Sequence, residues 1–356
     1  YVGFPLALYE SLNQLFKILD TMMASHIGAS AVSAVAYLSQ INMMISAVGT
    51  GLAVGASIKV SQAYGAGDFM LVKKRVSTMF AMCGALGIAI LLVLVPFTPE
   101  FLRLMNTPEE FIADGSTYFR LELFGMVITF FNNVYIAIER ARGNSKRILI
   151  LNTAVIVVKL GLTAWFVYGL DGGINMISCA TIISQSFLLL AACINMNQKG
   201  NAFGFSLRAI SIKKEVICPM LTLSFPVIVE RIAFAVGKVI VNSMSTVYGS
   251  WTVGALGISN NIGGITTNPQ NGFQEGGSSI ISQNLGAGRP KRALLAFRWV
   301  LYIDMLIGLV IMTASLLCLN QLAGLFAGDN AEFAGMIKQI YRFEAVGAIP
   351  LGVNAA

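Results

Sequence analysis

Four polar residues near the start of the chain recur at a helical spacing. Glu10, Asn13, Lys17 and Asp20 follow one another at i, i+3, i+7 and i+10 within an otherwise apolar stretch. This spacing places them along one face of an α-helix. Carboxylates beside an ammonium group can take up and release protons, or they can form a fixed ion pair. A lipid-facing position would be badly destabilising, so we expect this face to line an internal cavity.

A second polar set lies later in the chain. Residues 251–284 are rich in amide side chains and are interrupted by Pro269. Such residues either line water or bond to neighbouring helices, and both alternatives stand. The candidate cavity-lining residues are Asn13, Glu230, Lys238, Asn261, Asn268, Gln274 and Glu275, with Tyr135 from the aromatic stretch 130–135. An apolar core helix would give the same aromatic pattern as a ligand-binding face.

The composition indicates that the chain is a membrane protein. Fifty-six per cent of the 356 residues are hydrophobic, 12 per cent are charged, and the mean hydropathy is +0.74. Soluble domains carry about a quarter charged residues. Apolar stretches of about 20 residues, enough to cross a bilayer as a helix, recur along the whole length. We predict an all-α polytopic membrane protein.

Ten membrane spans are predicted. They cover residues 3–25, 31–62, 75–97, 116–138, 147–169, 173–195, 222–247, 251–284, 294–319 and 338–356. The five cysteines lie singly, without a pair at the spacing of metal ligands, so no metal site is predicted.

Basic residues gather in alternate loops between these spans. The loops at 64–74, 139–147, 196–215 and 285–293, with the residues beside them, hold 15 of the 24 lysines and arginines. Cytoplasmic loops carry such an excess, so these four loops and the N-terminus are predicted to be cytoplasmic. The net charge of +7 is therefore a topology signal, and we expect no nucleic-acid partner.

The two halves of the chain repeat one another. A shift of 221 residues aligns positions 4–67 with 225–288 without a gap, and 16 of the 64 residues are identical. The match includes "SQAYGAG" at 61–67 and "SQNLGAG" at 282–288. Six spans separate the copies, so both halves should have the same orientation, related by a pseudo-twofold axis along the membrane normal. The glycines of the motif predict a helix stop and a tight turn.

The repeat predicts the domain organisation. We expect an N-terminal lobe over 1–200, a cytoplasmic linker over 201–215 and a C-terminal lobe over 216–356, arranged as parallel six-helix units around a central cavity. Ala356 corresponds to about position 134 of the first half, inside its fourth span. We therefore expect a twelve-span parent, with the second lobe truncated here.

Several motifs together resemble the MATE (multidrug and toxic compound extrusion) transporters of the MOP flippase superfamily. They are the "FP…D" first helix, the "G…GAS…SQ…GAG" second helix of both halves, "ERARGNSKR" at 139–147 and "QNLGAGRPKRA" at 283–293. The resemblance implies two lobes around a central cavity and alternating access driven by inward H⁺ or Na⁺ flux. It also implies that the substrates are amphipathic organic cations.

The resemblance further implies a cation-coupling site in the first lobe. Asp20 matches the first-helix aspartate of the family, and Thr181 matches a sixth-helix threonine that joins it in sodium-linked relatives. The fifth-helix positions that carry Asn and Asp in those relatives are Lys159 and Thr163 here. Because an ammonium group repels Na⁺, this departure favours H⁺ over Na⁺. An ion pair of Asp20 with Lys159 or Lys17 is then either a proton-linked device or a fixed structural contact.

The leading hypothesis is therefore a multi-pass transporter of the cell membrane that exports small molecules in exchange for H⁺, without a bound cofactor. We expect it to act as a monomer within the lipid bilayer. A flippase for lipid-linked precursors is the alternative within the superfamily. An intramembrane enzyme would need a catalytic motif, and neither such a motif nor a nucleotide-binding loop is recognisable.

Overall fold

A computed structural model describes residues 3–24, 29–105, 107, 109–198, 201, 203–327 and 331–347. These residues form helices and turns and no strand, which confirms the predicted all-α class. The N-terminal lobe contains α1 Gly3–Ala24, α2 Ala29–Gly65, α3 Phe69–Leu94, α4 Thr98–Leu104, α5 Glu109–Ala141, α6 Ser145–Ala164, the π-helix η1 Trp165–Gly169 and α7 Ile174–Met196. After the 3₁₀-helix η2 Leu207–Ala209, the C-terminal lobe contains α8 Lys214–Ser245, η3 Thr246–Tyr248, α9 Ser250–Gly286, α10 Pro290–Leu317, α11 Leu319–Ala327 and α12 Ala331–Val346.

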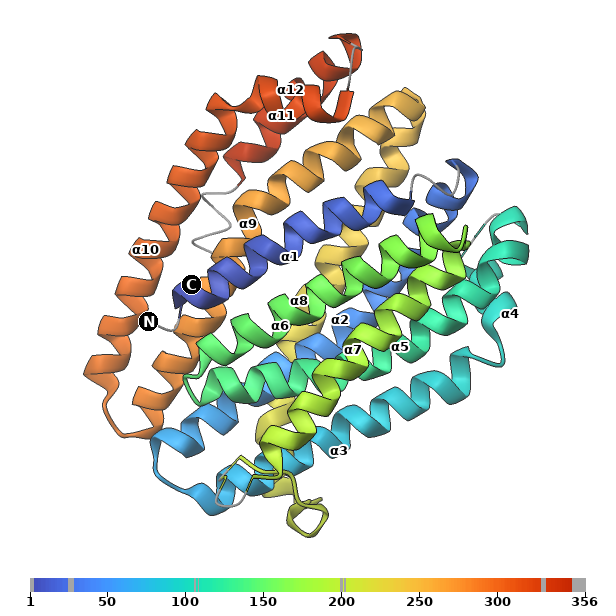
Figure 1. Ribbon diagram of the computed structural model, residues 1–356. Coiled ribbons are helices and arrows are strands. Elements are labelled where there is room, and N and C mark those ends of the chain that lie inside the picture. The colour runs from blue at the N-terminus through green and yellow to red at the C-terminus, as the bar shows by residue number, and fades with distance from the viewer. Residues whose placement is uncertain are drawn as a thin grey trace.

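Seven of the described helical segments are long and apolar enough to cross a membrane, as expected of a multi-pass protein. They are Ile41–Gly65, Phe69–Leu94, Gly115–Ala141, Ser145–Gly169, Ile174–Met196, Lys214–Ser245 and Pro290–Leu317. The predicted spans in α1, α9 and α12 are not among them. Helix α1 carries three charged residues, α9 carries many amides, and the described part of α12 has 16 residues. Two of these helices, α1 and α9, pack against each other inside the bundle (Figure 1).

The internal repeat is present in the helix boundaries. Helices α2 and α9 have the same length, 37 residues, and both their ends are 221 positions apart. Helix α10 likewise begins 221 residues after α3. The short helices α4 and α11, which were not predicted, begin at the same offset. The repeat therefore extends to short elements that hydropathy does not detect.

In each half of the chain, a long helix packs against a helix of the other half. Helix α2 packs along α8 of the other lobe, and α9 packs along α1. A Cβ atom at Gly51 would lie 2.8 Å from the side chain of Ile228, and one at Gly272 would lie 2.6 Å from the carbonyl oxygen of Leu6. These two contacts occupy equivalent places in the repeat. The glycines are therefore positions of close helix packing between the lobes, as their spacing indicated.

The repeated "GAG" motif has two separate roles. Gly67 and Gly288 have positive φ angles of 76° and 68° and form the turns that follow α2 and α9, as predicted. Gly65 and Gly286 instead lie where the ends of α2 and α9 contact each other, a role that the turn interpretation did not include.

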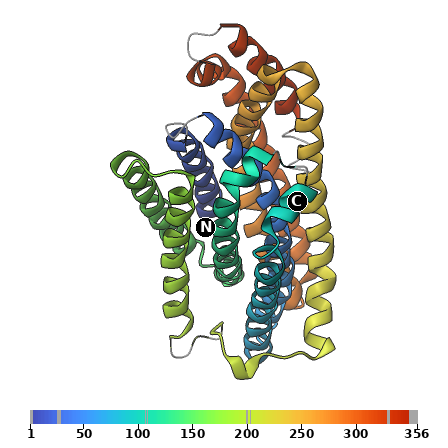
Figure 2. The same ribbon diagram turned by 90° about the vertical axis from the view of Figure 1, so that its right-hand side faces the viewer.

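The long helices run along one common direction (Figure 2), and their ends are arranged differently at the two sides of the bundle. The turns after α2 and α9 lie near each other, at the lower left of Figure 1. At the other side, α4 and α11 lie far apart. The lobes thus meet at the end of the bundle that carries the turns after α2 and α9, whereas the short helices α4 and α11 lie apart at the other end.

Candidate transport site between the lobes

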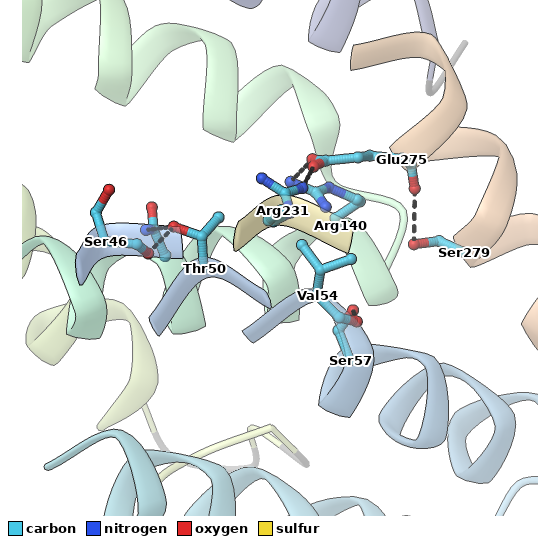
Figure 3. Close-up of polar contacts among 9 residues, drawn as sticks. Ser46, Thr50, Val54, Ser57, Arg140, Arg231, Glu275 and Ser279 are labelled. Atoms are coloured by element: carbon cyan, nitrogen blue, oxygen red, sulfur yellow. Dashed lines mark hydrogen bonds and ion pairs between the residues drawn. The ribbon is translucent and has the colours of Figure 1, made fainter. Parts of the chain in front are cut away.

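A cluster of charged side chains joins the two lobes. Glu275 of α9 forms ion pairs with Arg140 of α5 and with Arg231 of α8 (Figure 3). The second pair has an N–O distance of 3.2 Å. The side chains of Arg140 and Glu275 are 8% and 19% exposed, so this contact is largely shielded from solvent. One carboxylate of the second lobe therefore binds an arginine from each lobe.

Helix α1 brings a second carboxylate to this cluster. Glu10 lies within electrostatic range of Glu275, Arg140 and Arg231, and its side chain is hydrogen-bonded to that of Asn13. The resulting set of two acids and two bases, contributed by α1, α5, α8 and α9, is called the central ion cluster below. The cluster contains equal numbers of carboxyl and guanidinium groups. The first part of the predicted α1 face thus points between the lobes.

A hydrogen-bonded bridge links α1 to α9 next to this cluster. The amide nitrogen of Gln14 donates to the backbone carbonyl of Asn261 at 3.0 Å, and the amide of Asn268 donates to Gln14 at 2.9 Å. Gln14 is 6% exposed and lies against Gly264, where a Cβ atom would collide with its amide group. Asn268 through its side chain and Asn261 through its backbone therefore contact α1 of the other lobe.

Three further residues predicted to line the cavity lie on α8 and α9. Glu230 is exposed on α8, and its neighbour Arg231 occupies the position at the cluster instead. Lys238 lies farther along α8, with its ammonium 5.1 Å from the centre of the Phe234 ring. Gln274 is half-buried on α9, one residue before Glu275.

The assignment of Tyr135 to the cavity is wrong. Its side chain is 1% exposed within the hydrophobic core of the N-terminal lobe, and its hydroxyl accepts a hydrogen bond from Asn195 at 3.1 Å. Phe131 of the same stretch stacks on Phe80, and Phe130 is fully buried. The aromatic side chains of 130–135 are core residues because α5 is surrounded by α2, α3 and α7.

Only part of the predicted coupling site lies within the described residues. The side chains of Lys17 and Asp20 lie outside the described residues. Thr163 is fully buried on α6, and within the described residues its hydroxyl has no hydrogen-bond partner. Thr181 donates to the carbonyl of Ile177 in its own helix at 3.1 Å. Lys159 lies half-buried on α6, the helix that packs on α1 and α7.

Three residues of the site were not identified from the sequence. Arg140 was counted as a loop residue, although it lies in the last turn of α5. Arg231 adjoins Glu230, the residue chosen for the cavity, and it is Arg231 that reaches Glu275. Gln14 could have been found, because it continues the α1 spacing from Glu10 at i+4.

Comparisons with known proteins show the family of this chain. The MatE family model matches residues 5–165 and again 226–356, and the two matches begin at the offset of the internal repeat. "Probable multidrug resistance protein YoeA" of Bacillus subtilis (strain 168) is 25% identical over 334 residues, covering 92% of this chain and 72% of that protein. "Multidrug export protein MepA" of Staphylococcus aureus (strain NCTC 8325 / PS 47) is 23% identical, covering 96% and 76%.

Solved structures share the fold. A "Crystal structure of MATE in complex with MaD3S" superposes with a TM-score of 0.90 at 21% identity, covering 99% of this chain and 80% of the other. The "Outward-facing conformation of a multidrug resistance MATE family transporter of the MOP superfamily" gives 0.89 at 21% identity, covering 99% and 82%. Because the family model matches most of its length in two copies, this chain belongs to the MATE family of membrane transporters.

Proposed function

We propose that this protein is a secondary active multidrug exporter that moves amphipathic organic cations out of the cell in exchange for protons. The observation that carries the proposal is the central ion cluster, because it joins the two lobes through partners from both of them. Alternating access requires contacts between the lobes that form in one state and break in another. A largely shielded ion pair between the lobes can form in one state and break in the other.

The closed end of the bundle supports an outward-facing state. The lobes converge at the ends of α2 and α9, which are followed by the basic loops that we assign to the cytoplasm. The amide of Gln283 also donates to the carbonyl of Ala141 across the lobes, at 2.7 Å. Opening toward the cytoplasm must separate these contacts together with the Arg140–Glu275 pair. The names of the curated relatives, which describe multidrug resistance and export, support the class of substrate.

A flippase for lipid-linked precursors is the alternative. A pyrophosphate group would require an excess of cationic side chains in the cavity. The central ion cluster contains as many carboxylates as guanidinium groups. This balance favours the export of organic cations over the transport of a pyrophosphate.

Transport in proteoliposomes tests the proposal. The purified protein is reconstituted, a fluorescent cationic dye is loaded, and pH and Na⁺ gradients are imposed separately. We expect dye movement to follow the pH gradient and to be indifferent to Na⁺. Movement driven by Na⁺ alone would exclude proton coupling, and movement without either gradient would exclude antiport.

A further inference from the structure

The middle of α10 contains a buried carboxyl group that the proposed transport cycle does not use. Asp304 lies about 20 Å along this helix, counted at 1.5 Å per residue from Pro290. Its side chain has 0% exposure. It shares its helix face with Val300 and Gly308, which are also buried. An aspartate at this depth is costly to bury and needs a compensating partner.

The described residues supply no such partner. Neither carboxyl oxygen of Asp304 accepts a hydrogen bond from them. Gln270 of α9 lies against this position, but its amide donates to the backbone carbonyl of Asp304, at 3.2 Å, and not to the carboxyl group.

The charged groups on the neighbouring helices are engaged elsewhere or exposed. On α9, Glu275 pairs with two arginines. On α12, Glu344 accepts from Ser259, Lys338 donates to Asn320, and Glu332 and Arg342 are exposed. Helix α11 carries no charged residue, and the basic residues of α10 itself, Lys291, Arg292 and Arg298, are exposed near its start.

The internal repeat shows that the fold does not require an acid here. The equivalent of Asp304 in the first lobe is Cys83 of α3, which is also fully buried. The equivalent of Gln270 is Gly49 of α2. Helices α2 and α3 pack against each other as α9 and α10 do. The same helix pair therefore forms with a thiol and a glycine, and the polar pair is a property of the second lobe alone.

We propose that Asp304 is a proton-binding site of the C-terminal lobe, separate from the predicted coupling aspartate of the first lobe. A carboxyl group without a cationic partner in an apolar setting is stable only in its neutral form, which carries the proton. The proton leaves to water when α9 and α10 admit water between them. The further claim that this proton is coupled to export rests on the proposed function.

Helix α9 connects this site to the interface between the lobes. Gln270, which contacts Asp304, follows Pro269, and Asn268 binds Gln14 of the other lobe. Proline removes one backbone hydrogen bond within a helix and allows it to bend there. A change in the charge of Asp304 thus acts on a bendable segment of α9 that holds the two lobes together.

Infrared spectroscopy tests proton binding directly, without transport. In proteoliposomes at neutral pH, we expect a carbonyl stretch of neutral carboxylic acids that loses intensity in Asp304→Asn and keeps its intensity in Asp20→Asn. A spectrum that is the same with and without Asp304 would overturn the proposal.

If Asp304→Asn does not fold, the wild-type protein is treated with dicyclohexylcarbodiimide, which attacks protonated carboxyl groups. Mass spectrometry should then find label on Asp304 and not on the ion-paired Glu275, and the absence of label on Asp304 would overturn the proposal equally.

Dye transport tests the coupling. Asp304→Asn should reduce proton-driven efflux by about tenfold or more, while dye binding changes little and Asp304→Glu restores part of the rate. Cys83→Ser, at the equivalent buried position, is the matched control and should transport normally. Wild-type efflux from Asp304→Asn would overturn the coupling role. If the wild-type protein shows no proton-driven efflux, the proposed function fails, whereas the infrared result still decides whether Asp304 holds a proton.

Discussion

Gly65 of α2 and Gly286 of α9 make reciprocal contacts across the interface between the lobes. A Cβ atom at Gly65 would overlap the carbonyl oxygen of Gln283, and one at Gly286 would overlap the carbonyl oxygen of Gln62. The two glycines are equivalent in the repeat, and so are the two glutamines. The repeated "SQ..GAG" motif therefore marks the place where the two halves touch, close to their pseudo-twofold axis.

Substitution of either glycine should loosen this contact. Gly65→Ala and Gly286→Ala each force a methyl group against a backbone carbonyl, which cannot rotate away, at a cost of about 1–3 kcal/mol. We expect a lower melting temperature in detergent and faster labelling of cysteines placed in α2 and α9 near the contact. Gly257→Ala is the control, because the space beside Gly257 on α9 is open. Equal stability of all three variants would show that the contact does not hold the lobes together.

The central ion cluster should respond unequally to loss of its members. Glu275→Gln leaves the guanidinium group of Arg140 shielded from solvent without its counter-ion, and breaking such a buried pair costs about 3–5 kcal/mol. Arg231 is 37% exposed, so Arg231→Gln should cost less. Thermal unfolding measures both effects.

A double-mutant cycle separates this interaction from side effects of the substitutions. Arg140→Met combined with Glu275→Leu should destabilise less than the sum of the single variants, because neither member of the shielded Arg140–Glu275 pair is left without the other. Strict additivity would mean that the two side chains do not interact in the membrane.

The bridge between Gln14 and Asn268 should also be measurable as a coupling. Asn268→Leu removes one hydrogen bond between the lobes, and a neutral bond of this kind contributes about 1 kcal/mol. We expect a non-additive effect with Gln14→Leu and an altered substrate profile at normal expression. Gln274→Leu, on the same helix, is the comparison and should be additive with Gln14→Leu. If Asn268 behaves like Gln274 in both assays, the bridge has no role in holding the lobes.

The sequence predicted the long helices and their symmetry because both depend on local patterns. Hydropathy over about 20 residues identifies a span, and the 221-residue repeat implies equivalent helices in both halves. The short helices α4 and α11 were missed because 7 and 9 residues are too few to give a span signal. The predicted seventh span begins at residue 222, whereas helix α8 begins at Lys214 and contains both Pro219 and Pro226.

The site was less predictable because its residues take their partners from helices that are distant in sequence. Helical spacing correctly placed Glu10 and Asn13 on one face of α1, but it does not name what that face meets. Glu275 binds arginines that are 135 and 44 residues away in sequence, Arg140 and Arg231. Tyr135 has the same local pattern whether α5 faces a cavity or a core, and the packing of α7 against α5 decides for the core.

The topology prediction can be tested by cysteine labelling. In a background without the five native cysteines, Lys146→Cys places an exposed thiol in the predicted cytoplasmic loop after α5, and Glu100→Cys places one in the predicted outer segment at α4. An impermeant maleimide added to intact cells should label Glu100→Cys alone and should label both after permeabilisation. Labelling of Lys146→Cys in intact cells would reverse the assigned orientation.

The predicted coupling site of the first lobe gives the last prediction. Lys159 occupies a position at which the resemblance to sodium-linked MATE transporters predicts a cation ligand, and its helix α6 packs on α1, which carries Asp20. An ammonium group that pairs with Asp20 must separate from it before the carboxylate takes up a proton, which links proton entry to a movement of these helices. Asp20→Asn should therefore abolish proton-driven efflux without loss of dye binding. Lys159→Asn should change the pH dependence of efflux, and together with Thr163→Asp it should introduce a response to Na⁺, because the ammonium group is then replaced by oxygen ligands. Efflux that requires Na⁺ in the wild type and survives Asp20→Asn would move the coupling out of this lobe and toward the acidic residues of the second.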